Sequence, residues 1–589
     1  MQRTLVALAC AALLSSCGAP ATNAPPPAPS GAPGAGEPAA ALPPQPAPAP
    51  VTLSIVGTND LHGALPRLPI LAGYLHNLRD ARRADGGGVI LLDGGDLFQG
   101  TLESNIAEGA DVVTAYNALG YTAAAIGNHE FDFGPVGPDV TVQRPGDDPR
   151  GALKARAAEA KFPFLVANII DEQTRAGVAW PNVLPSIKVQ VAGVSVGIIG
   201  LSTEVTPTTT MPANFLGLRM SPSAEAATYA ARKLRAEGAK VVVIAAHVGS
   251  KCKDLTNPDD VSSCDRDEEV FRILQALEPG LIDAWVGGHT HAAMAHRVNG
   301  VAVIESYASG RAFGRVDLLV SADGIVSSKI YPPTDLCPLG PDKTPVSAEA
   351  CAPGEYEGKP VVRDPAIQAI VDAASERTRE RREEDLGVTA LATITRSYDH
   401  ESALGNWFTD LMLAARPDAQ IALTNGGGLR ANVPAGPITY GELFQAMPFD
   451  NRFALIKLQG RQVREMIAQN LGRGGAQYSW GGLTVTATCK AAGLALDVRV
   501  AGKPLVDGKV YTVVTSDFLA AGGDGTLSRF QLPPSSIEVT EVIIRDAFAE
   551  LLRAKRGAAK RLDVGQLFNP QAPRQRFPGS RPVTCGAAR

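Results

Sequence analysis

Side chains that can bind metal ions or transfer protons follow several short apolar runs in the sequence. The clearest case is the stretch 123–132, where alanines and an isoleucine end in a glycine and Asn128, His129 and Asp132 follow. A run broken in this way is typical of a buried strand that ends in a loop. There, an amide, an imidazole and a carboxylate could supply a neutral ligand, a general acid and the group that orients the acid. A single histidine at a strand end more often has a packing role, so this stretch alone does not establish a site.

Four more apolar runs end in residues of the same kind, and this repetition favours a functional site. Five of the eight histidines of the chain fall in the five motifs. Carboxylate, amide and imidazole ligands suit divalent ions such as Zn, Mn or Co. These ligands are too many for one ion. Two ions about 3.5–4 Å apart that share one carboxylate would use all of them. Such a pair of ions is suited to the hydrolysis of phosphate esters. The four further runs and their residues are 51–56 with Asp60 and His62, 89–92 with Asp96, 241–246 with His247, and 282–286 with His289 and His291.

Asp96 is the natural bridge between two such ions, because it is the one aspartate taken as a ligand between the flanking motifs. His76, His296 and His400 match no ligand position, and we expect them to be surface or packing residues. Glu130 has two interpretations, one in which it orients a ligand and one in which it is solvated.

The elements that must position these residues are short strands separated by segments of helix length, such as residues 69–83. This order predicts a layered α/β domain. We expect the carboxyl ends of its strands to converge on one edge of one sheet. Residues 133–160 and 251–267 follow site motifs and are expected to rim the site.

Length and composition indicate a multidomain globular protein. At 589 residues the chain exceeds the size at which a single core keeps growing, so two or more domains are expected. Hydrophobic residues make up 45% and charged residues 20%, with a net charge of −5. This nearly neutral balance argues against a nucleic-acid surface or an electrostatic membrane patch.

The N-terminus predicts export. Arg3 and the apolar run 5–14 form a signal segment too short to remain as a membrane-spanning helix. Residues 14–17 resemble the processing site of bacterial lipoproteins, which implies cleavage before Cys17, lipidation of its thiol and, with Gly18 next, attachment to the outer membrane facing the periplasm or the cell surface. The alternative is an ordinary secretory signal and a soluble periplasmic or secreted protein. Residues 18–50, mainly Pro, Ala and Gly, predict an extended tether.

Six cysteines remain after the signal segment, and none has zinc-finger spacing. Disulfides are therefore the better interpretation in an oxidising compartment. Six cysteines allow fifteen pairings, between which sequence alone does not choose. Proximity along the chain favours Cys252–Cys264 and Cys337–Cys351, which leaves Cys489 for Cys585.

The ordered motifs resemble the signature of the calcineurin-like metallophosphoesterases. Residues 58–63, 99–101 and 128–132 are similar to the 5′-nucleotidase branch, and the match covers about residues 51–570. The resemblance implies a four-layer α/β/β/α sandwich over residues 51–334, a linker and interdomain helix over 335–386, and a second α/β, substrate-binding domain over 387–589. The motifs that carry it are Asp60-x-His62, Gly95-Asp96, Gly127-Asn128-His129-Glu130, His247 and Gly288-His289-x-His291.

The resemblance also implies a role for each motif residue. Metal-bound water would attack the phosphorus atom, and His129, oriented by Asp132, would stabilise the charge that develops on the phosphoryl group or the leaving oxygen. One ion would be held by Asp60, His62, Asp96 and His291, and the other by Asp96, Asn128, His247 and His289.

The C-terminal half contains glycine-rich loops of its own. The loop at 424–430 follows the strand-like segment 420–423 and ends in Arg430, whose guanidinium can bind phosphate. The resemblance implies that Phe449 and Phe518 sandwich a nucleobase, that Asp524 binds the ribose hydroxyls, and that Asn425 and Arg430 contact the base and the phosphate side. Relatives carry further arginines just before residues 401–406, where this chain has Tyr398 and His400; Arg396 is the nearest candidate to replace them. Before this half, a helix is expected over 366–385, with its charged end 376–385 facing solvent.

These features predict an exported metal-dependent phosphohydrolase that converts nucleoside 5′-monophosphates, and also di- and triphosphates, to nucleoside and phosphate. Its partners would be a small-molecule nucleotide and, through Cys17 alone, a membrane. Two alternatives within the same chemistry are a 2′,3′-cyclic nucleotide phosphodiesterase and a nucleotide-sugar pyrophosphatase. An alternative of another class is a surface-binding protein that has lost catalysis, against which the complete ligand set argues.

Overall fold

The computed structural model describes residues 49–341, 344–491, 493–554 and 561–585. The predicted signal segment, Cys17 and nearly all of the tether lie outside the described residues. Among the helices described, none has the length and apolar character needed to cross a lipid bilayer.

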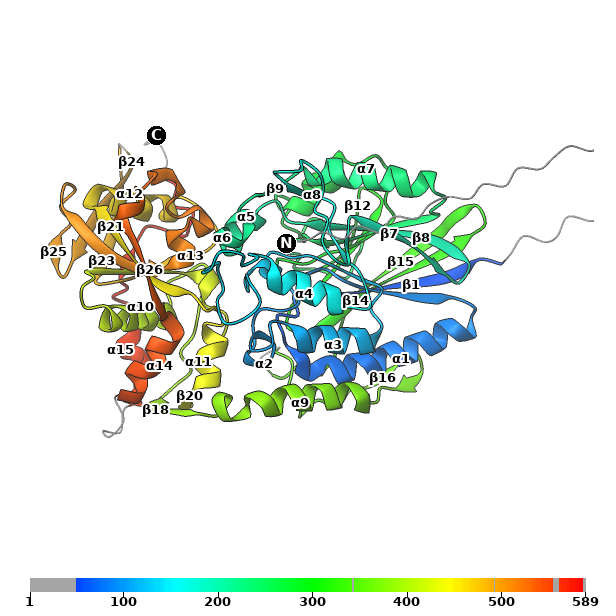
Figure 1. Ribbon diagram of the computed structural model, residues 1–589, viewed down its shortest axis with the longest axis horizontal. Helices are drawn as coiled ribbons and strands as arrows, with labels where there is room; N and C mark the ends of the chain where they lie inside the picture. The colour runs from blue at the N-terminus through cyan, green and yellow to red at the C-terminus, as the bar shows by residue number, and fades with distance from the viewer. Residues whose placement is uncertain (1–48, 342–343, 492, 555–560, 586–589) are drawn as a thin grey trace, which may run out of the picture. The chain divides into compact units, whose positions relative to one another are not determined.

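Two β-sheets form the centre of the N-terminal half (Figure 1). Parallel strands carry the predicted site residues in both sheets, and antiparallel strands flank them. The first sheet has the order β15 (Gly324–Asp335), β14 (Ala312–Ser321), β1 (Val51–Thr58), β2 (Gly88–Asp93), β3 (Ala123–Ala125), β4 (Phe164–Leu165), β6 (Val183–Leu184). The second has the order β12 (Ala293–Val298), β13 (Val301–Ser306), β11 (Ala284–Val286), β10 (Val241–His247), β8 (Val194–Ser202), β7 (Ser186–Val191).

Both faces of the central strands are buried, which explains why their sequences are apolar without a gap. Ile55 of β1 and Val243 of β10 belong to one core that lies between the two sheets. Val56, which follows Ile55, points to the opposite face of the first sheet and packs in a core shared with helices. Val242, which precedes Val243, does the same on the outer face of the second sheet. The layers are therefore helix, sheet, sheet and helix, with α1 (Leu68–Ala84), α3 (Ala110–Leu119) and α9 (Pro365–Arg382) outside the first sheet and α7 (Ser223–Ala236) and α8 (Glu269–Ala276) outside the second (Figure 1).

The predicted layered α/β domain is confirmed, but the expectation of one sheet edge is wrong. The strands β1, β2 and β3 lie in the first sheet, and β10 and β11 lie in the second. Their carboxyl ends nevertheless meet, because the sheets pack face to face. The loop after β2 reaches the loop after β10 at Gly94, whose carbonyl oxygen lies 3.0 Å from His247 Nδ1.

Helix α9 joins the two halves of the chain. It begins at Pro365 after Asp364, whose side chain accepts from the backbone amides of Ala366 and Ile367 and so caps the helix. Most charged side chains of its end 376–385 are exposed, as expected, and two of its arginines also pair with the N-terminal half. Arg382 Nη1 lies 2.8 Å from Glu103 Oε1 of α2 (Leu102–Asn105), and Arg377 pairs with Asp111 of α3. These ion pairs and the apolar face of the helix attach α9 to the N-terminal half.

The C-terminal half is a second α/β unit built on a five-stranded sheet. Helices α10 (Ala403–Ala415), α11 (Tyr440–Ala446) and α14 (Ile544–Ala554) cover one side. Helix α12 (Gly460–Leu471) and a smaller sheet pack on the other. The five strands are β22 (Tyr478–Gly481), β19 (Ile421–Asn425), β26 (Val510–Ser516), β21 (Arg452–Gln459) and β27 (Ile537–Ile543); the smaller sheet has β25 (Lys503–Pro504), β24 (Gly493–Val500), β23 (Leu483–Lys490) and β29 (Gln575–Arg576).

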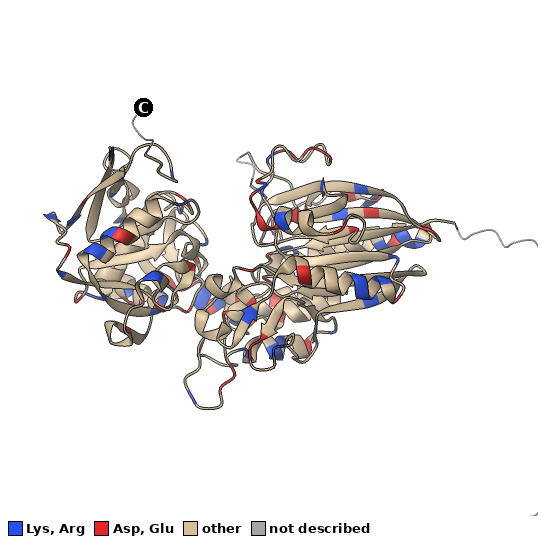
Figure 2. Ribbon diagram, turned by 90° about the horizontal axis from the view of Figure 1, so that it is seen from above, with Lys and Arg blue, Asp and Glu red and all other residues tan. Residues whose placement is uncertain are grey.

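Three disulfides join the pairs that proximity along the chain favours. They are Cys252–Cys264, Cys337–Cys351 and Cys489–Cys585. The first closes a short segment beside β12, and the last attaches the end of the chain to β23. Lysine and arginine are interspersed with aspartate and glutamate along the helices and loops (Figure 2). Three disulfides agree with the oxidising compartment that the sequence predicts.

Candidate active site

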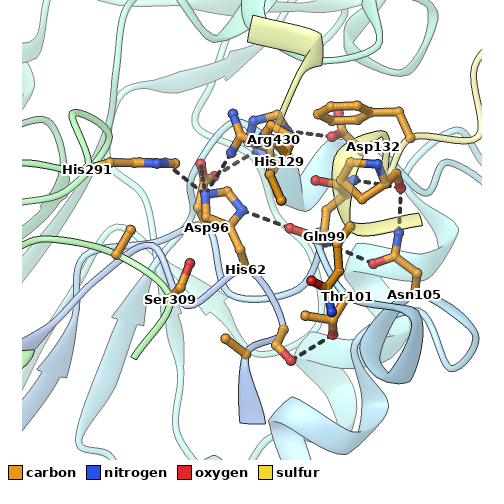
Figure 3. Close-up of a pocket in the computed structure, with 18 of the residues that line it drawn as sticks. His62, Asp96, Gln99, Thr101, Asn105, His129, Asp132, His291, Ser309 and Arg430 are labelled. Atoms are coloured by element: carbon orange, nitrogen blue, oxygen red, sulfur yellow. Dashed lines mark hydrogen bonds and ion pairs between the residues drawn. The ribbon is translucent and has the colours of Figure 1, made fainter. Parts of the chain in front are cut away.

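The predicted ligands come together at the carboxyl ends of β1, β2, β3, β10 and β11 in two groups. In the first, His62 Nε2 lies 2.9 Å from His291 Nε2, and His291 Nε2 lies 3.4 Å from Asp60 Oδ1. These three side chains converge so closely that a single ion could contact one atom of each. His62 and His291 of this group are labelled in Figure 3, together with Asp96 and Arg430 nearby.

The second group lies beside the first. His247 Nε2 is 2.9 Å from Asp96 Oδ2, 3.1 Å from Asn128 Oδ1 and 3.2 Å from His289 Nδ1. Asp96 Oδ2 is also 3.8 Å from His62 Nε2 of the first group. Asp96 therefore stands between the two groups, as its position in the sequence predicts.

The site backbone adopts an unusual conformation at five of these residues. Asp60, His62, Asp96, His289 and His291 have φ between 49° and 79°, the left-handed region that side chains other than glycine rarely adopt. Such conformations persist where surrounding contacts enforce them, and they cluster at functional sites. A glycine is also required next to them: a Cβ at Gly127 would lie 2.1 Å from Asp96 Oδ1.

Hydrogen bonds behind the histidines select the ring nitrogen that faces the site. His62 Nδ1 donates to the carbonyl oxygen of Gln99 at 2.8 Å, and His247 Nδ1 donates to that of Gly94 at 3.0 Å. Each ring therefore presents Nε2 to the group. A carbonyl behind the ring is the usual support for a histidine that binds metal.

The charges of the site call for a cation. Asp60 and Asp96 are at most 1% exposed. Burial opposes protonation of His247, yet the Asp96 carboxylate raises its pKa to about 10, so the anionic surroundings strongly favour a positive charge at this point of the site. Burial and the neighbouring His247 lower the pKa of His289 to about 3, which keeps its ring neutral. Two buried carboxylates, imidazole nitrogens and an amide oxygen fit divalent metal ions in donor type and arrangement, and an ion would supply the positive charge that these surroundings favour.

His129 and Asp132 form a pair beside the ligands. His129 Nδ1 lies 2.5 Å from Asp132 Oδ2, and Asp132 Oδ1 accepts a hydrogen bond from Thr210 at 2.9 Å. Burial lowers the pKa of His129, but the carboxylates of Asp132 and Asp96 raise it by a larger amount, so the net shift of the pKa is upward. With Nδ1 bound, Nε2 is the nitrogen left to meet a substrate.

Buried supports hold the ligand loops, and sequence reasoning finds only some of them. Glu130 accepts from the backbone amides of Asp96, Leu97 and Gly127 at 2.6–2.9 Å, so of its two interpretations the orienting one is correct. Asn59 was missed: its side chain donates to Asp60 Oδ2 and accepts from the amide of Ser306. Its position next to Asp60 in the motif is the signal that could have identified it.

The predicted substrate residues line the same cavity of about 1600 Å³ as His62, Asp96 and His129. Arg430 Nη2 reaches within 3.1 Å of His62 Nε2, which places its guanidinium at the ligand groups. The rings of Phe449 and His129 are 5.7 Å apart between centroids. The remaining residues of this set on the cavity wall are Asn425, whose amide donates to Asp524 at 2.6 Å, Phe518, Asp524 and Arg396.

The two long segments also reach the cavity, as expected. Phe133 and Val140 of one and Lys251 and Asp265 of the other lie on its wall. The other three histidines are away from the ligand groups. His296 is buried near Cys264, while His76 and His400 are largely exposed and pair with Asp364 and Asp399.

Comparison with known proteins agrees with this architecture. The calcineurin-like phosphoesterase family model matches residues 53–293, and the 5′-nucleotidase C-terminal domain model matches residues 383–531. The chain belongs to the 5′-nucleotidase family. It is accordingly a metal-dependent phosphoric ester hydrolase with a catalytic and a C-terminal domain.

The chain matches two members of this family over most of their own length. It is 26% identical to Protein UshA of Yersinia enterocolitica over 507 residues, which covers 80% of this chain and 86% of that protein. It is 26% identical to the snake venom 5′-nucleotidase of Naja atra over 535 residues, covering 80% and 90%. The crystal structure of the 5′-nucleotidase precursor from Thermus thermophilus has the same fold, with a TM-score of 0.63 at 23% identity and coverage of 87% and 99%.

Proposed function

We propose that this chain hydrolyses nucleoside 5′-monophosphates to nucleoside and phosphate, and also accepts di- and triphosphates. The observation that carries the proposal is one cavity lined both by the two ligand groups and by Asn425, Arg430, Phe449, Phe518 and Asp524. A site that only hydrolysed small phosphate esters would not need aromatic and acidic residues from a second domain. The name of the snake venom relative supports the same substrate class.

We propose that each of the two groups of side chains holds one metal ion. Asp60, His62 and His291 would hold one divalent ion; Asn128, His247 and His289 would hold the other, with Asp96 shared. Zn, Mn and Co are the ions that this donor set suits best. When bound, the ions would neutralise the phosphoryl charge and activate the attacking water.

The residues of the chain position the ester and stabilise its charge. Arg430 would bind the phosphate, since its guanidinium lies at the ligand groups, and Arg396 would add a second positive charge on the same wall. His129, held through Nδ1 by Asp132, would direct Nε2 at the phosphoryl group or the leaving oxygen. Phe449 and Phe518 would stack on the base, while Asn425 contacts it and Asp524 binds the ribose hydroxyls.

The size of the cavity favours a second candidate, a nucleotide-sugar pyrophosphatase. Its 1600 Å³ exceeds the roughly 300–1,000 Å³ usual for small-molecule sites, so there is room for a larger ester. A panel of AMP, ADP, a UDP-sugar and a 2′,3′-cyclic nucleotide, each with Mn²⁺, Zn²⁺ or Co²⁺, distinguishes the candidates. The proposal predicts the highest kcat/KM for AMP, and a higher value for the UDP-sugar or the cyclic nucleotide would replace it. Binding of all four without release of product would indicate a protein that has lost catalysis.

We further propose export, with a lipid anchor at Cys17. The three disulfides and the venom origin of one relative support export. Labelling of cells with a radioactive fatty acid tests the anchor, because only an acylated Cys17 would carry the label and Cys17→Ser would lose it.

A further inference from the structure

A buried carboxylate outside the ligand groups belongs to Glu305, near the end of β13. It follows the apolar run 301–304 and is 1% exposed. A buried carboxylate is costly unless hydrogen-bond donors surround it. Sequence reasoning assigns no role to this residue, so the source of its donors is informative.

Its donors come from the two loops that carry three of the proposed ligands. Glu305 Oε2 accepts from the backbone amide of Ser250 at 2.9 Å. Oε1 accepts from the hydroxyl of Thr290 at 2.7 Å and from its backbone amide at 3.2 Å. Ser250 lies three residues after His247, and Thr290 lies between His289 and His291. One side chain thus joins the loop after β10 to the loop after β11.

The loops are shaped around this carboxylate. A Cβ at Gly249 would lie 1.9 Å from Glu305 Oε2, so only glycine allows the backbone to approach so closely. Thr290 Oγ, whose proton goes to Glu305, also lies 3.3 Å from the carbonyl oxygen of Ser250, so the same two loops touch directly at this point. His289 and His291, on either side of Thr290, have φ of 79° and 56°, conformations that need outside contacts to persist.

We propose that Glu305 is a positioning residue that holds His247, His289 and His291 at the separation that binding of both metal ions requires. This inference rests on the ligand roles proposed above. Because Glu305 connects loops that serve both ion sites, its loss should weaken both. Groups that support metal ligands in this way typically change metal affinity by about 10–100-fold when mutated.

Glu305→Gln tests the proposal with little change of shape. The new glutamine side chain has an NH₂ group in place of one carboxylate oxygen. This NH₂ group faces either the backbone N–H of Ser250 or the two donors of Thr290, so one attractive contact becomes repulsive. Calorimetric titration of the metal-free full-length chain with Mn²⁺ should show affinity about 10–100-fold weaker than wild type at both sites.

Asp283→Asn is the matched control. Asp283 Oδ2 accepts from the backbone amide of Val242, at the opposite end of β10 from His247. Its removal should lower thermal stability but leave Mn²⁺ affinity within about twofold of wild type, as expected for a site distant from the ligands. A purely structural role for Glu305 predicts the same behaviour in both variants.

Thr290→Val decides the matter if Glu305→Gln does not fold. It keeps the shape of the side chain and removes one hydrogen bond to Glu305, so affinity should fall by roughly two- to tenfold. Wild-type Mn²⁺ affinity in a folded Glu305→Gln, or in Thr290→Val where the former is unfolded, overturns the inference. Absence of Mn²⁺ binding to the wild-type chain would instead contradict the proposed function.

Discussion

At the scale of single residues, the loops that carry the proposed ligands have strained backbone conformations, which direct the side chains into the site. A non-glycine residue in a sparsely populated backbone region costs about 1–3 kcal/mol, and five proposed ligands adopt one. Backbone contacts between loops sustain them: the amide of Asp60 donates to Gly95, and the amide of His289 donates to Asp60 Oδ2. Asp60 is therefore both a proposed ligand and a support for the opposite loop.

His129 is expected to act on the substrate without holding metal. Neither ring nitrogen belongs to a ligand group, and the backbone amide that donates to Asp96 at 2.9 Å survives substitution by alanine. His129→Ala should lower kcat for AMP by about 10²–10⁴-fold, the usual contribution of a proton-transferring side chain. Metal content, measured by mass spectrometry of the elements, should stay near two ions per chain. Unchanged turnover would remove His129 from the mechanism.

Residues that belong to local motifs could be predicted, whereas supports that lie far away in the chain could not. Asp60, Asp96 and His247 follow strand-like runs, a pattern that is visible within a few positions. Glu305 bonds Ser250 across 55 positions, and no local pattern indicates such a contact. The shared position of Asp96 follows from its place between the flanking motifs.

At the scale of elements, the loops after β19, α11 and β26 supply the proposed nucleotide contacts. The loop after α11 is held firmly, since the buried Arg545 donates to the carbonyl oxygens of Met447 and Phe449 at 3.2–3.3 Å. This support was not predicted, because Arg545 lies almost 100 positions away. The charged end of α9 is largely solvated, as predicted, but its ion pair with Glu103 could not be predicted because Glu103 belongs to another helix.

Loss of an aromatic ring from the proposed base site should lower the hydrolysis of nucleotides much more than the hydrolysis of simple phosphate esters. Base stacking on an aromatic side chain contributes about 1–3 kcal/mol, so Phe518→Ala should lower kcat/KM for AMP by roughly 5–150-fold. Hydrolysis of p-nitrophenyl phosphate, which has no base or ribose, should change little. Phe449→Ala should act similarly with some loss for both substrates, because Phe449 also lies against His129. Equal losses for both substrates in Phe518→Ala would argue against base stacking.

At the scale of the whole molecule, the two halves have separate cores but share the cavity. The order of the halves could be predicted from the motifs, and proximity along the chain favours the cysteine pairing that the structure contains. The division of the predicted strands between two sheets could not be predicted, because buried parallel strands have the same apolar sequence pattern in either sheet.

The Cys489–Cys585 disulfide should stabilise the C-terminal half more than the other disulfides stabilise their loops. It spans 96 positions, whereas Cys252–Cys264 spans 12, and longer loops lose more entropy in the unfolded chain on closure. Replacing both Cys489 and Cys585 by serine should cost about 2–5 kcal/mol of unfolding free energy. Urea unfolding followed by tryptophan fluorescence measures this loss, and the Cys252→Ser/Cys264→Ser variant is the comparison. An unchanged urea midpoint would contradict the expectation.

Anomalous X-ray scattering from crystals of the Mn²⁺-loaded chain tests the central claim most directly. The account predicts two peaks about 3.5–4 Å apart, one on either side of Asp96, the first among Asp60, His62 and His291 and the second among Asn128, His247 and His289. A single peak, no peak, or peaks away from Asp96 would contradict it.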